Sequence, residues 1–147
     1  MPAGDLVVND WEIELRATLM GGSTVYAIDR ARGAIGGLFD VVVKQPETDY
    51  AHAAGAFVGD SFAAARTLTV ALELGGTAVE AGDGVEVMQT TWAPSSTDLP
   101  LYFKVPGFGK RYVNGRPAGL VVDYKNADFG LIPMLASFRI TDPTIYT

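Results

Sequence analysis

The chain has 147 residues, no cysteine, and 17 acidic against 11 basic residues, which gives a formal net charge of −6. The absence of cysteine excludes disulfides and thiolate sites, and the acidic charge argues against electrostatic capture of nucleic acid. No stretch approaches the roughly 20 apolar residues that span a bilayer, and the N-terminus lacks the basic and apolar pattern of a signal peptide. We expect one domain over residues 1–147 that buries about two-thirds of its unfolded surface.

Apolar residues recur with a period of two over most of the chain, which predicts β-strands. The clearest alternating runs are residues 11–16, 66–74 and 131–140. In the first run, Glu12 and Glu14 alternate with the apolar positions and are expected on a wet face. In the third run, five residues share the face expected in the core: Ile132, Met134, Ala136, Phe138 and Ile140. Pro133 cannot donate to a ladder, so it indicates the first residues of that strand or an edge.

Shorter runs predict further strands at residues 24–28, 38–44, 101–105, 111–113 and 120–124. Glycine and proline pairs separate them, at Gly21-Gly22, Gly75-Gly76 and Pro106-Gly107. Between the last two runs, Asn114-Gly115 is the dipeptide that a type I′ hairpin prefers. We therefore expect a β-hairpin over residues 111–124.

Residues 77–94 break this rhythm and predict the one substantial helix. Their apolar positions form one helical stripe: Ala81, Val85, Met88 and Trp92. Thr77 with Glu80 has the form of a capping box, and Pro94 would end the helix. A later start, with Asp83 as N-cap and Glu86 at N3, is the alternative. Gly82 and Gly84 each cost about 1 kcal/mol relative to alanine.

Residues 50–65 are alanine-rich but contain glycine and show no apolar stripe, so we interpret them as a long loop. Loops of this length usually carry function or make interfaces. The predicted fold class is mainly β, a β-sandwich or flattened barrel of about seven to nine strands, with one flanking α-helix packed on it through Trp92.

The sequence offers no catalytic, cofactor-binding or metal-binding residues. His52 is the only histidine, and its neighbours supply no nucleophile for a general base. One histidine without cysteine excludes the usual zinc sets, and residues 80–86 lack the acidic spacing of a calcium loop. We therefore expect no enzyme and no cofactor.

Two other segments could suggest binding sites, but structural roles are favoured for them. Residues 33–37 are glycine-rich, but no Lys-Ser/Thr pair follows, so a turn or a bulged strand start is favoured over a phosphate-binding loop. A modest basic cluster is interleaved with aromatic side chains: Lys104, Lys110, Arg111, Arg116, Tyr102, Phe103, Phe108 and Tyr112. Four charges on an acidic domain make a weak case for single-strand binding. The mean hydropathy of +0.19 is high for a small monomer and favours a homo-oligomer.

Four segments, taken in order, resemble the N-terminal domain of the distal tail proteins, also called minor tail proteins, of long-tailed, siphovirus-type phages that infect actinobacteria. They are VGDSFAAARTLTVALEL (58–74), TTWAP (90–94), LPLYFKVPGFGKRYVNGRPAGLVVDY (99–124) and ASFRITDPTIYT (136–147). The features carried over are the helix that ends at Trp92, the Asn114-Gly115 turn and the last strand with its Asp142-Pro143 corner. The similarity is weakest over residues 1–37.

This resemblance implies a tail-tube-like fold and a structural virion protein. Such domains form hexameric rings that join the tail tube to the tail tip or baseplate, and DNA passes through them without specific binding. The implied partners are other copies of the chain, the tail tube protein and other tail-tip proteins, with assembly in the host cytoplasm and no membrane contact. A second, often carbohydrate-binding-like domain commonly follows in the family, and this sequence departs from that pattern by ending at Thr147, so the accessory domain is expected to be absent.

The charge fits a ring that passes DNA. Six copies carry 6 × (−6), a formal charge of −36, which would repel phosphates from an acidic lumen. Residues 50–65 and the hairpin at 111–116 are the expected subunit contacts. The alternative function is a carbohydrate-binding β-sandwich module in host attachment, with Trp11, Tyr102 and Phe108 as its candidate platform. A small β-barrel enzyme is the third possibility, and it would need paired titratable groups in a cleft.

Overall fold

The computed structural model describes residues 4–21, 26–29, 33, 35–39, 43–44, 47–49, 56–58, 62–63, 65–75, 78–125, 131–142 and 144–147. For Ala78, Ala81 and the residues between 43 and 63 it describes only the backbone. Eight strands form one antiparallel sheet: β1 (Glu12–Leu15), β2 (Thr18–Gly21), β3 (Tyr26–Ile28), β4 (Ile35–Gly36), β9 (Arg66–Leu74), β10 (Leu99–Lys104), β11 (Arg111–Val122) and β12 (Ile132–Ile140). One helix, α1, spans Ala78–Thr91.

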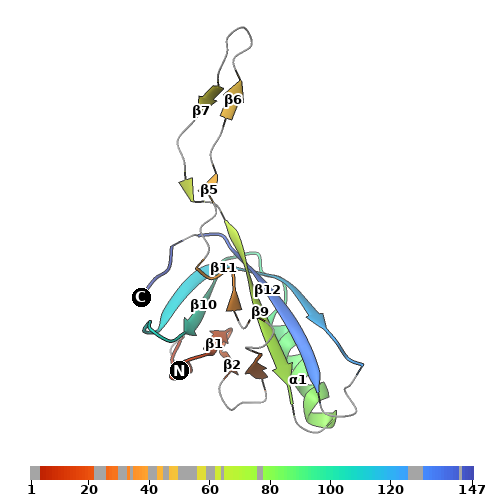
Figure 1. Ribbon diagram of the computed structural model, residues 1–147. Coiled ribbons are helices and arrows are strands. Elements are labelled where there is room, and N and C mark those ends of the chain that lie inside the picture. The colour runs from red at the N-terminus through yellow and green to blue at the C-terminus, as the bar shows by residue number, and fades with distance from the viewer. Residues whose placement is uncertain are drawn as a thin grey trace.

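The sheet curls into a nearly closed barrel (Figure 1). Its strand order is β2-β1-β10-β11-β12-β9-β3, and β4 pairs with the other half of the β9 edge. The two ends of this path, β2 and β3, contact each other without a ladder among the described residues. The predicted fold class, mainly β with seven to nine strands and one flanking helix, is confirmed.

Strand β11 runs straight through the Asn114-Gly115 dipeptide, so the predicted hairpin over residues 111–124 is wrong. Its first half pairs with β10 and its second half with β12, while Gly115 pairs with both Leu99 and Ile140. Neither Asn114 nor Gly115 has the positive φ that a type I′ turn requires. A β-bulge between Pro117 and Gly119 interrupts the register of β11 with β12, shortly after the point where β11 changes partners.

Gly115 is needed for packing rather than for a turn. A Cβ atom there would lie 2.1 Å from the carbonyl oxygen of Arg139 on β12. Because only glycine allows this approach, the dipeptide that favours a hairpin locally is used to bring two strands together.

Two short pairs of strands lie outside the main sheet. Strand β6 (Glu47–Asp49) pairs with β7 (Ala56–Val58), and β5 (Val43–Lys44) pairs with β8 (Phe62–Ala63). In Figure 1 the β6–β7 pair lies away from the barrel. The loop predicted over residues 50–65 therefore contains β7 and β8. Among the described residues of the strand predicted at 38–44, β5 is a strand and Leu38 and Phe39 lie in a bend.

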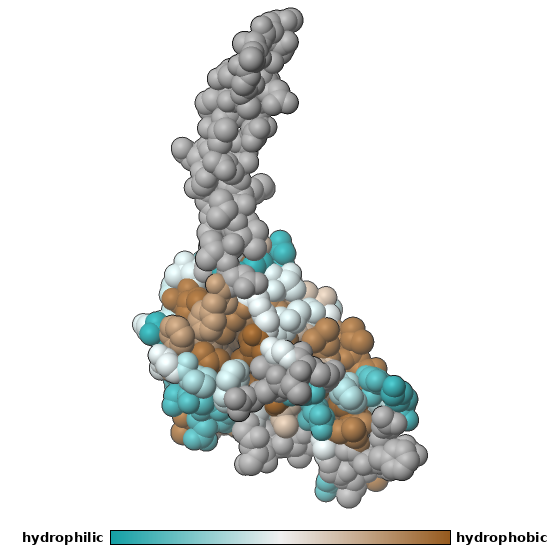
Figure 2. Space-filling view, viewed as in Figure 1, coloured by the Kyte–Doolittle hydropathy of each residue, from teal (hydrophilic) through white to brown (hydrophobic). Residues whose placement is uncertain are grey.

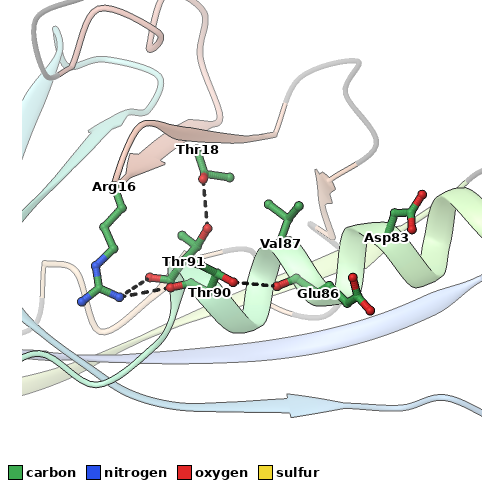
Figure 3. A pocket seen from close by; sticks show the side chains of 7 residues that line it. All are labelled: Arg16, Thr18, Asp83, Glu86, Val87, Thr90 and Thr91. Atoms are coloured by element: carbon green, nitrogen blue, oxygen red, sulfur yellow. Dashed lines mark hydrogen bonds between the residues drawn. The ribbon is translucent and has the colours of Figure 1, made fainter.

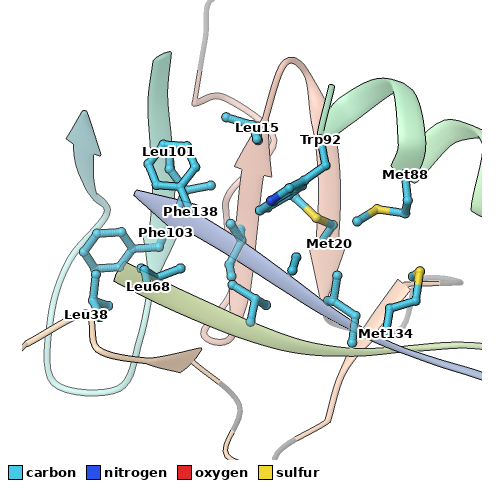
Figure 4. Packing of buried hydrophobic residues seen from close by; sticks show 14 of the residues in the cluster. Leu15, Met20, Leu38, Leu68, Met88, Trp92, Leu101, Phe103, Met134 and Phe138 are labelled. Atoms are coloured by element: carbon cyan, nitrogen blue, oxygen red, sulfur yellow. The ribbon is translucent and has the colours of Figure 1, made fainter. Parts of the chain in front are cut away.

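The core lies inside the barrel and is closed on one side by α1 (Figure 4). All five predicted core residues of β12 are at most 1% exposed. Pro133 is the second residue of β12, as predicted, but β12 is a central strand and not an edge. Helix α1 packs through Met88 and Trp92, both buried, and the Trp92 indole N–H donates to the Ser137 carbonyl at 2.8 Å.

The helix begins at Ala78, so the alternative start at Asp83 is wrong; Thr77 lies outside the described residues. Gly84 lets α1 approach the sheet, because a Cβ there would lie 2.4 Å from the Leu74 Cδ2 atom. No helix among the described residues is long and apolar enough to cross a membrane.

The N-terminal segment covers the outer face of β1, so Glu12 and Glu14 are buried at 4% and 3% exposure rather than wet. Glu14 accepts hydrogen bonds from the backbone N–H groups of Gly4 (2.7 Å) and Leu6 (3.0 Å), and Glu12 accepts one from Asn9. Both carboxylates therefore fix the segment against the sheet, because a buried charge is tolerated only where hydrogen bonds replace water.

The last residues return to the barrel instead of leaving it. Tyr146 forms a two-bond antiparallel bridge with Tyr112, on the edge of β11 that β12 leaves open. The Tyr146 hydroxyl donates to Asp142 Oδ2 at 2.5 Å. Pro143, whose restriction of the chain was part of the predicted corner, lies outside the described residues.

Candidate functional site

The described residues contain no constellation that carries chemistry. None of them forms a group of three potential metal ligands, and every buried side-chain nitrogen or oxygen among them has a hydrogen-bond partner. His52 lies outside the described residues. The candidate sites are therefore surfaces: a cleft beside α1 and an apolar groove at the other side of the core.

The helix cleft has a volume of about 470 Å³ and lies between α1 and the β1–β2 turn (Figure 3). Its lining residues are Arg16, Thr18, Asp83, Glu86, Val87, Thr90 and Thr91. The turn exists because Arg16 and Ala17 adopt φ of 50° and 59°, the pair of positive angles that a two-residue type I′ turn needs. This turn was missed, because neither residue is one of the types that favour positive φ.

Arg16 binds the end of the helix through one nitrogen of its guanidinium. Its Nη1 donates to the carbonyl oxygens of Thr90 (3.2 Å), Thr91 (3.2 Å) and Ala93 (2.8 Å). A cation at this place complements the partial negative charge of a helix C-terminus. The hydroxyls of Thr18 and Thr91 bond each other at 2.9 Å. The cleft therefore joins a hairpin to the helix and presents no activated nucleophile.

The aromatic groove has a volume of about 320 Å³ and an almost wholly apolar lining: Trp11, Ile35, Leu38, Phe39, Val105, Pro106 and Phe108. Phe39 and Phe108 stack with ring centroids 5.0 Å apart and are 50% and 46% exposed. Arg66 holds one wall in place, because it donates to the carbonyl oxygens of Gly37 (3.2 Å) and Leu38 (2.9 Å). Large apolar side chains that remain exposed together indicate an interaction surface.

One cation borders this groove. The Arg111 guanidinium lies 5.8 Å from the Phe108 ring centre, and it forms no ion pair with a described residue. Lys110 follows Phe108 closely in the chain, but its ammonium donates to the Gly4 carbonyl at 3.0 Å. Lys104 donates to Val8 and lies 3.9 Å from Asp10.

The structure separates the residues that the sequence grouped. Of the three aromatic candidates for a platform, Trp11 and Phe108 line the groove, whereas Tyr102 packs against Tyr112 in a tilted arrangement with ring centroids 5.1 Å apart. Arg116 leaves the basic cluster and pairs with Asp98 at 3.0 Å. Because β11 is a central strand, residues 111–116 also lose the hairpin geometry for which they were expected to make contacts.

Phe39 and Leu38 were not identified from the sequence, since only the tertiary fold brings residues 35–39 beside residues 105–108. Other apolar side chains are exposed on β11, β12 and the residues beside them: Val121, Tyr124, Leu131 and Leu135. Figure 2 shows hydrophobic areas reaching the surface of the barrel between hydrophilic ones.

No family model matches the chain, and no curated protein matches it in sequence. Among solved structures, its fold is similar to that of SPP1 Dit, described as a paradigm of the hub adsorption apparatus in phages that infect Gram-positive bacteria. The TM-score is 0.70 at 16% identity, over 92% of this chain and 51% of Dit. Chains of the phage p2 baseplate in its activated conformation, with calcium and with strontium, give a TM-score of 0.62 at 11% identity, over 88% of this chain and 43% of theirs.

The chain therefore spans about half the length of the structures it matches. Its barrel with one helix is the fold of these phage hub and baseplate proteins.

Proposed function

We propose that this chain is a structural protein of a bacteriophage tail tip. In this proposal it forms a hexameric ring at the distal end of the tail tube, connects the tube to the tip or baseplate, and lines the DNA channel. The observation that carries the proposal is the fold likeness to SPP1 Dit over 92% of the chain, with a TM-score of 0.70. The number of copies, and an actinobacterial host, come from the sequence resemblance to distal tail proteins.

The partners follow from this role. They are other copies of the chain, the tail tube protein and other tail-tip proteins, and the site of action is the virion tail after assembly in the host cytoplasm. A structural, non-enzymatic role agrees with a helix cleft in which Arg16 donates to backbone carbonyls at the helix end and the hydroxyls of Thr18 and Thr91 bond each other.

The strand pairs between residues 43 and 63 are a candidate for contacts between copies. The β6–β7 pair lies away from the barrel in Figure 1. An antiparallel pair that extends from a domain can reach a neighbouring subunit. This proposal keeps the predicted contact role of residues 50–65 and replaces the predicted loop by strands.

Light scattering combined with negative-stain imaging tests the ring. We expect closed rings with a central channel at high protein concentration, or on addition of the tail tube protein. A strict monomer under both conditions would contradict the proposed function. An assembly without a channel would contradict the proposed role in passing DNA.

A carbohydrate-binding module is the second candidate, and one observation favours it: Trp11 and Phe108 both line the aromatic groove. Sugar sites, however, need several converging polar groups beside the aromatic platform. Here Arg111 lies against one ring, and Arg66 is bonded to the backbone carbonyls of one wall. Titration calorimetry with cell-wall saccharides separates the two candidates, because heat of binding that is lost in Phe108→Ala would favour the carbohydrate-binding function.

A further inference from the structure

The aromatic groove and the exposed face of helix α1 lie on opposite sides of the core. Figure 4 places Leu38 and Phe103 at one side and Met88 and Trp92 at the other. Surfaces on opposite sides of a subunit cannot meet within one chain, but they can join successive copies head to tail. A head-to-tail interface is the type that closes a ring.

The aromatic groove is complementary to a partner surface that is apolar and also carries negative charge. Its lining is apolar, and its two exposed rings, Phe39 and Phe108, offer a contact area that water solvates poorly. The Arg111 guanidinium lies over the Phe108 ring and has no carboxylate partner among the described residues. On a chain with a net charge of −6, this is a local positive site beside an apolar surface.

The exposed face of α1 has the complementary character. Val79 and Val87 are 74% and 43% exposed, although valine is usually buried. Asp83 and Glu86 are exposed between them and form no ion pair with any described residue. Positions 79, 83, 86 and 87 follow helical spacing, so the two valines and the two carboxylates share one face.

We propose that this face of α1 docks into the aromatic groove of the next copy, with Val79 and Val87 against Phe39 and Phe108 and with Arg111 facing the two carboxylates. The inference rests on the proposed ring and names the surfaces that close it. Opposite charges at a contact favour one register over others, which is how six copies can repeat one geometry.

Cross-linking tests the contact directly, since the chain has no native cysteine. One chain carries Val79→Cys and another carries Gly109→Cys, where a Cβ atom meets nothing within 4 Å and the groove stays intact. The two chains are mixed and treated with a short bis-maleimide. The control mixture replaces Gly109→Cys by Val121→Cys, at a position that is likewise exposed.

We expect mixed dimers at a yield about tenfold above the control mixture, because a specific contact raises the local concentration of the two thiols. Equal yields in the two mixtures, while light scattering shows that the chain assembles, would overturn this inference and leave the proposed ring standing. A monomer without cross-links at every concentration would overturn both.

A charge exchange gives an independent test. Arg111→Glu alone and Glu86→Arg alone should each raise the concentration needed for assembly by about tenfold, because each places like charges together. The double variant should return assembly to within about threefold of the native chain, since it restores the pair in reverse. Lys125→Glu, an exposed charge reversal at a residue that belongs neither to the groove lining nor to the four named residues of α1, is the control. Additive losses in the double variant would overturn the pairing.

Discussion

Gly115 lies where β10, β11 and β12 meet, and the backbone of β12 occupies the space that a side chain would need. A Cβ atom would lie 2.1 Å from the Arg139 carbonyl oxygen and 2.8 Å from the Phe138 ring. Neither neighbour can move freely, because one is backbone in a ladder and the other is a buried core residue. The strand exchange in β11 therefore depends on a single residue without a side chain.

The first prediction concerns this position. Gly115→Ala should lower the free energy of unfolding by about 1–3 kcal/mol, the usual cost of overpacking. Gly119→Ala on the same strand is the matched control, because its Cβ would meet nothing within 4 Å. Urea denaturation measures both. Equal stability of the two variants would show that β12 can shift to make room.

A charge-assisted hydrogen bond between Asp142 and Tyr146 fixes the C-terminal residues. The Tyr146 hydroxyl and the Thr144 N–H bond the carboxylate, which lowers the pKa of Asp142. The same bond raises the pKa of Tyr146. Because the folded-state pKa of Asp142 lies below its unfolded value, its contribution is complete above about pH 5 and is lost as the pH falls through the folded pKa. Because the folded-state pKa of Tyr146 is raised, the contribution of this hydrogen bond to stability is lost only when the pH rises above about 10.

The second prediction follows from this window. Asp142→Asn should lower the urea midpoint at neutral pH, and its difference from the native chain should vanish near about pH 2, where the native carboxyl is protonated as well. Asp83→Asn is the control, since its carboxylate accepts no hydrogen bond from the described residues. A difference in the urea midpoint that persists unchanged at low pH would mean that the negative charge of Asp142 does not stabilise the C-terminal residues.

Residue-level prediction from the sequence succeeded where the pattern itself sets the outcome. The alternation in residues 66–74 and 131–140 predicted β9 and β12 almost to the residue, because a buried face repeats every second position. It failed at Asn114-Gly115, where packing against β12 overrides turn preference, and at Glu12 and Glu14, which the N-terminal segment covers. Neither cause is local in sequence, so neither leaves a local signal.

Helix α1 closes the barrel although it contains two glycines that weaken it. At Gly84 an added Cβ atom would clash with Leu74, whereas at Gly82 it would lie 3.6 Å from the Tyr124 hydroxyl, an ordinary contact distance. The two glycines are therefore alike in sequence and different in role. The stripe of Val85, Met88 and Trp92 could be predicted because tertiary contact and helical spacing agree; the depth of packing at Gly84 could not.

The third prediction compares the two positions. Gly82→Ala should raise the free energy of unfolding by about 0.5–1 kcal/mol, because alanine is the better helix former and has room. Gly84→Ala should lack this gain and lower the stability, since the Leu74 side chain would have to move. Thermal unfolding followed by circular dichroism measures both. A similar gain for the two variants would contradict the close packing of α1 on β9.

The net negative charge of the chain would affect DNA passage only when several copies assemble into a ring. Around a closed ring the negative charge of each copy adds, and a channel lined by it would not retain phosphates. The aromatic groove could not be predicted, because it joins residues 35–39 to residues 105–108 across the fold. The mainly β fold could be predicted, because the two-residue alternation of apolar residues is visible within each single strand.

The fourth prediction is that assembled rings do not retain DNA. In a mobility-shift experiment at physiological salt, single- and double-stranded DNA should migrate as free DNA at every ring concentration, because like charges repel. A shift that disappears when salt is raised would indicate a basic lumen and contradict the proposed channel.

The most direct test of the proposed function is the location of the chain in a virion. Cryo-electron microscopy of a phage that encodes this chain should show a ring of six copies, each of 15.6 kDa, between the last tube ring and the tail tip. The barrel should face the channel in that ring. Density for the chain elsewhere in the particle, or its absence from purified virions, would contradict the account.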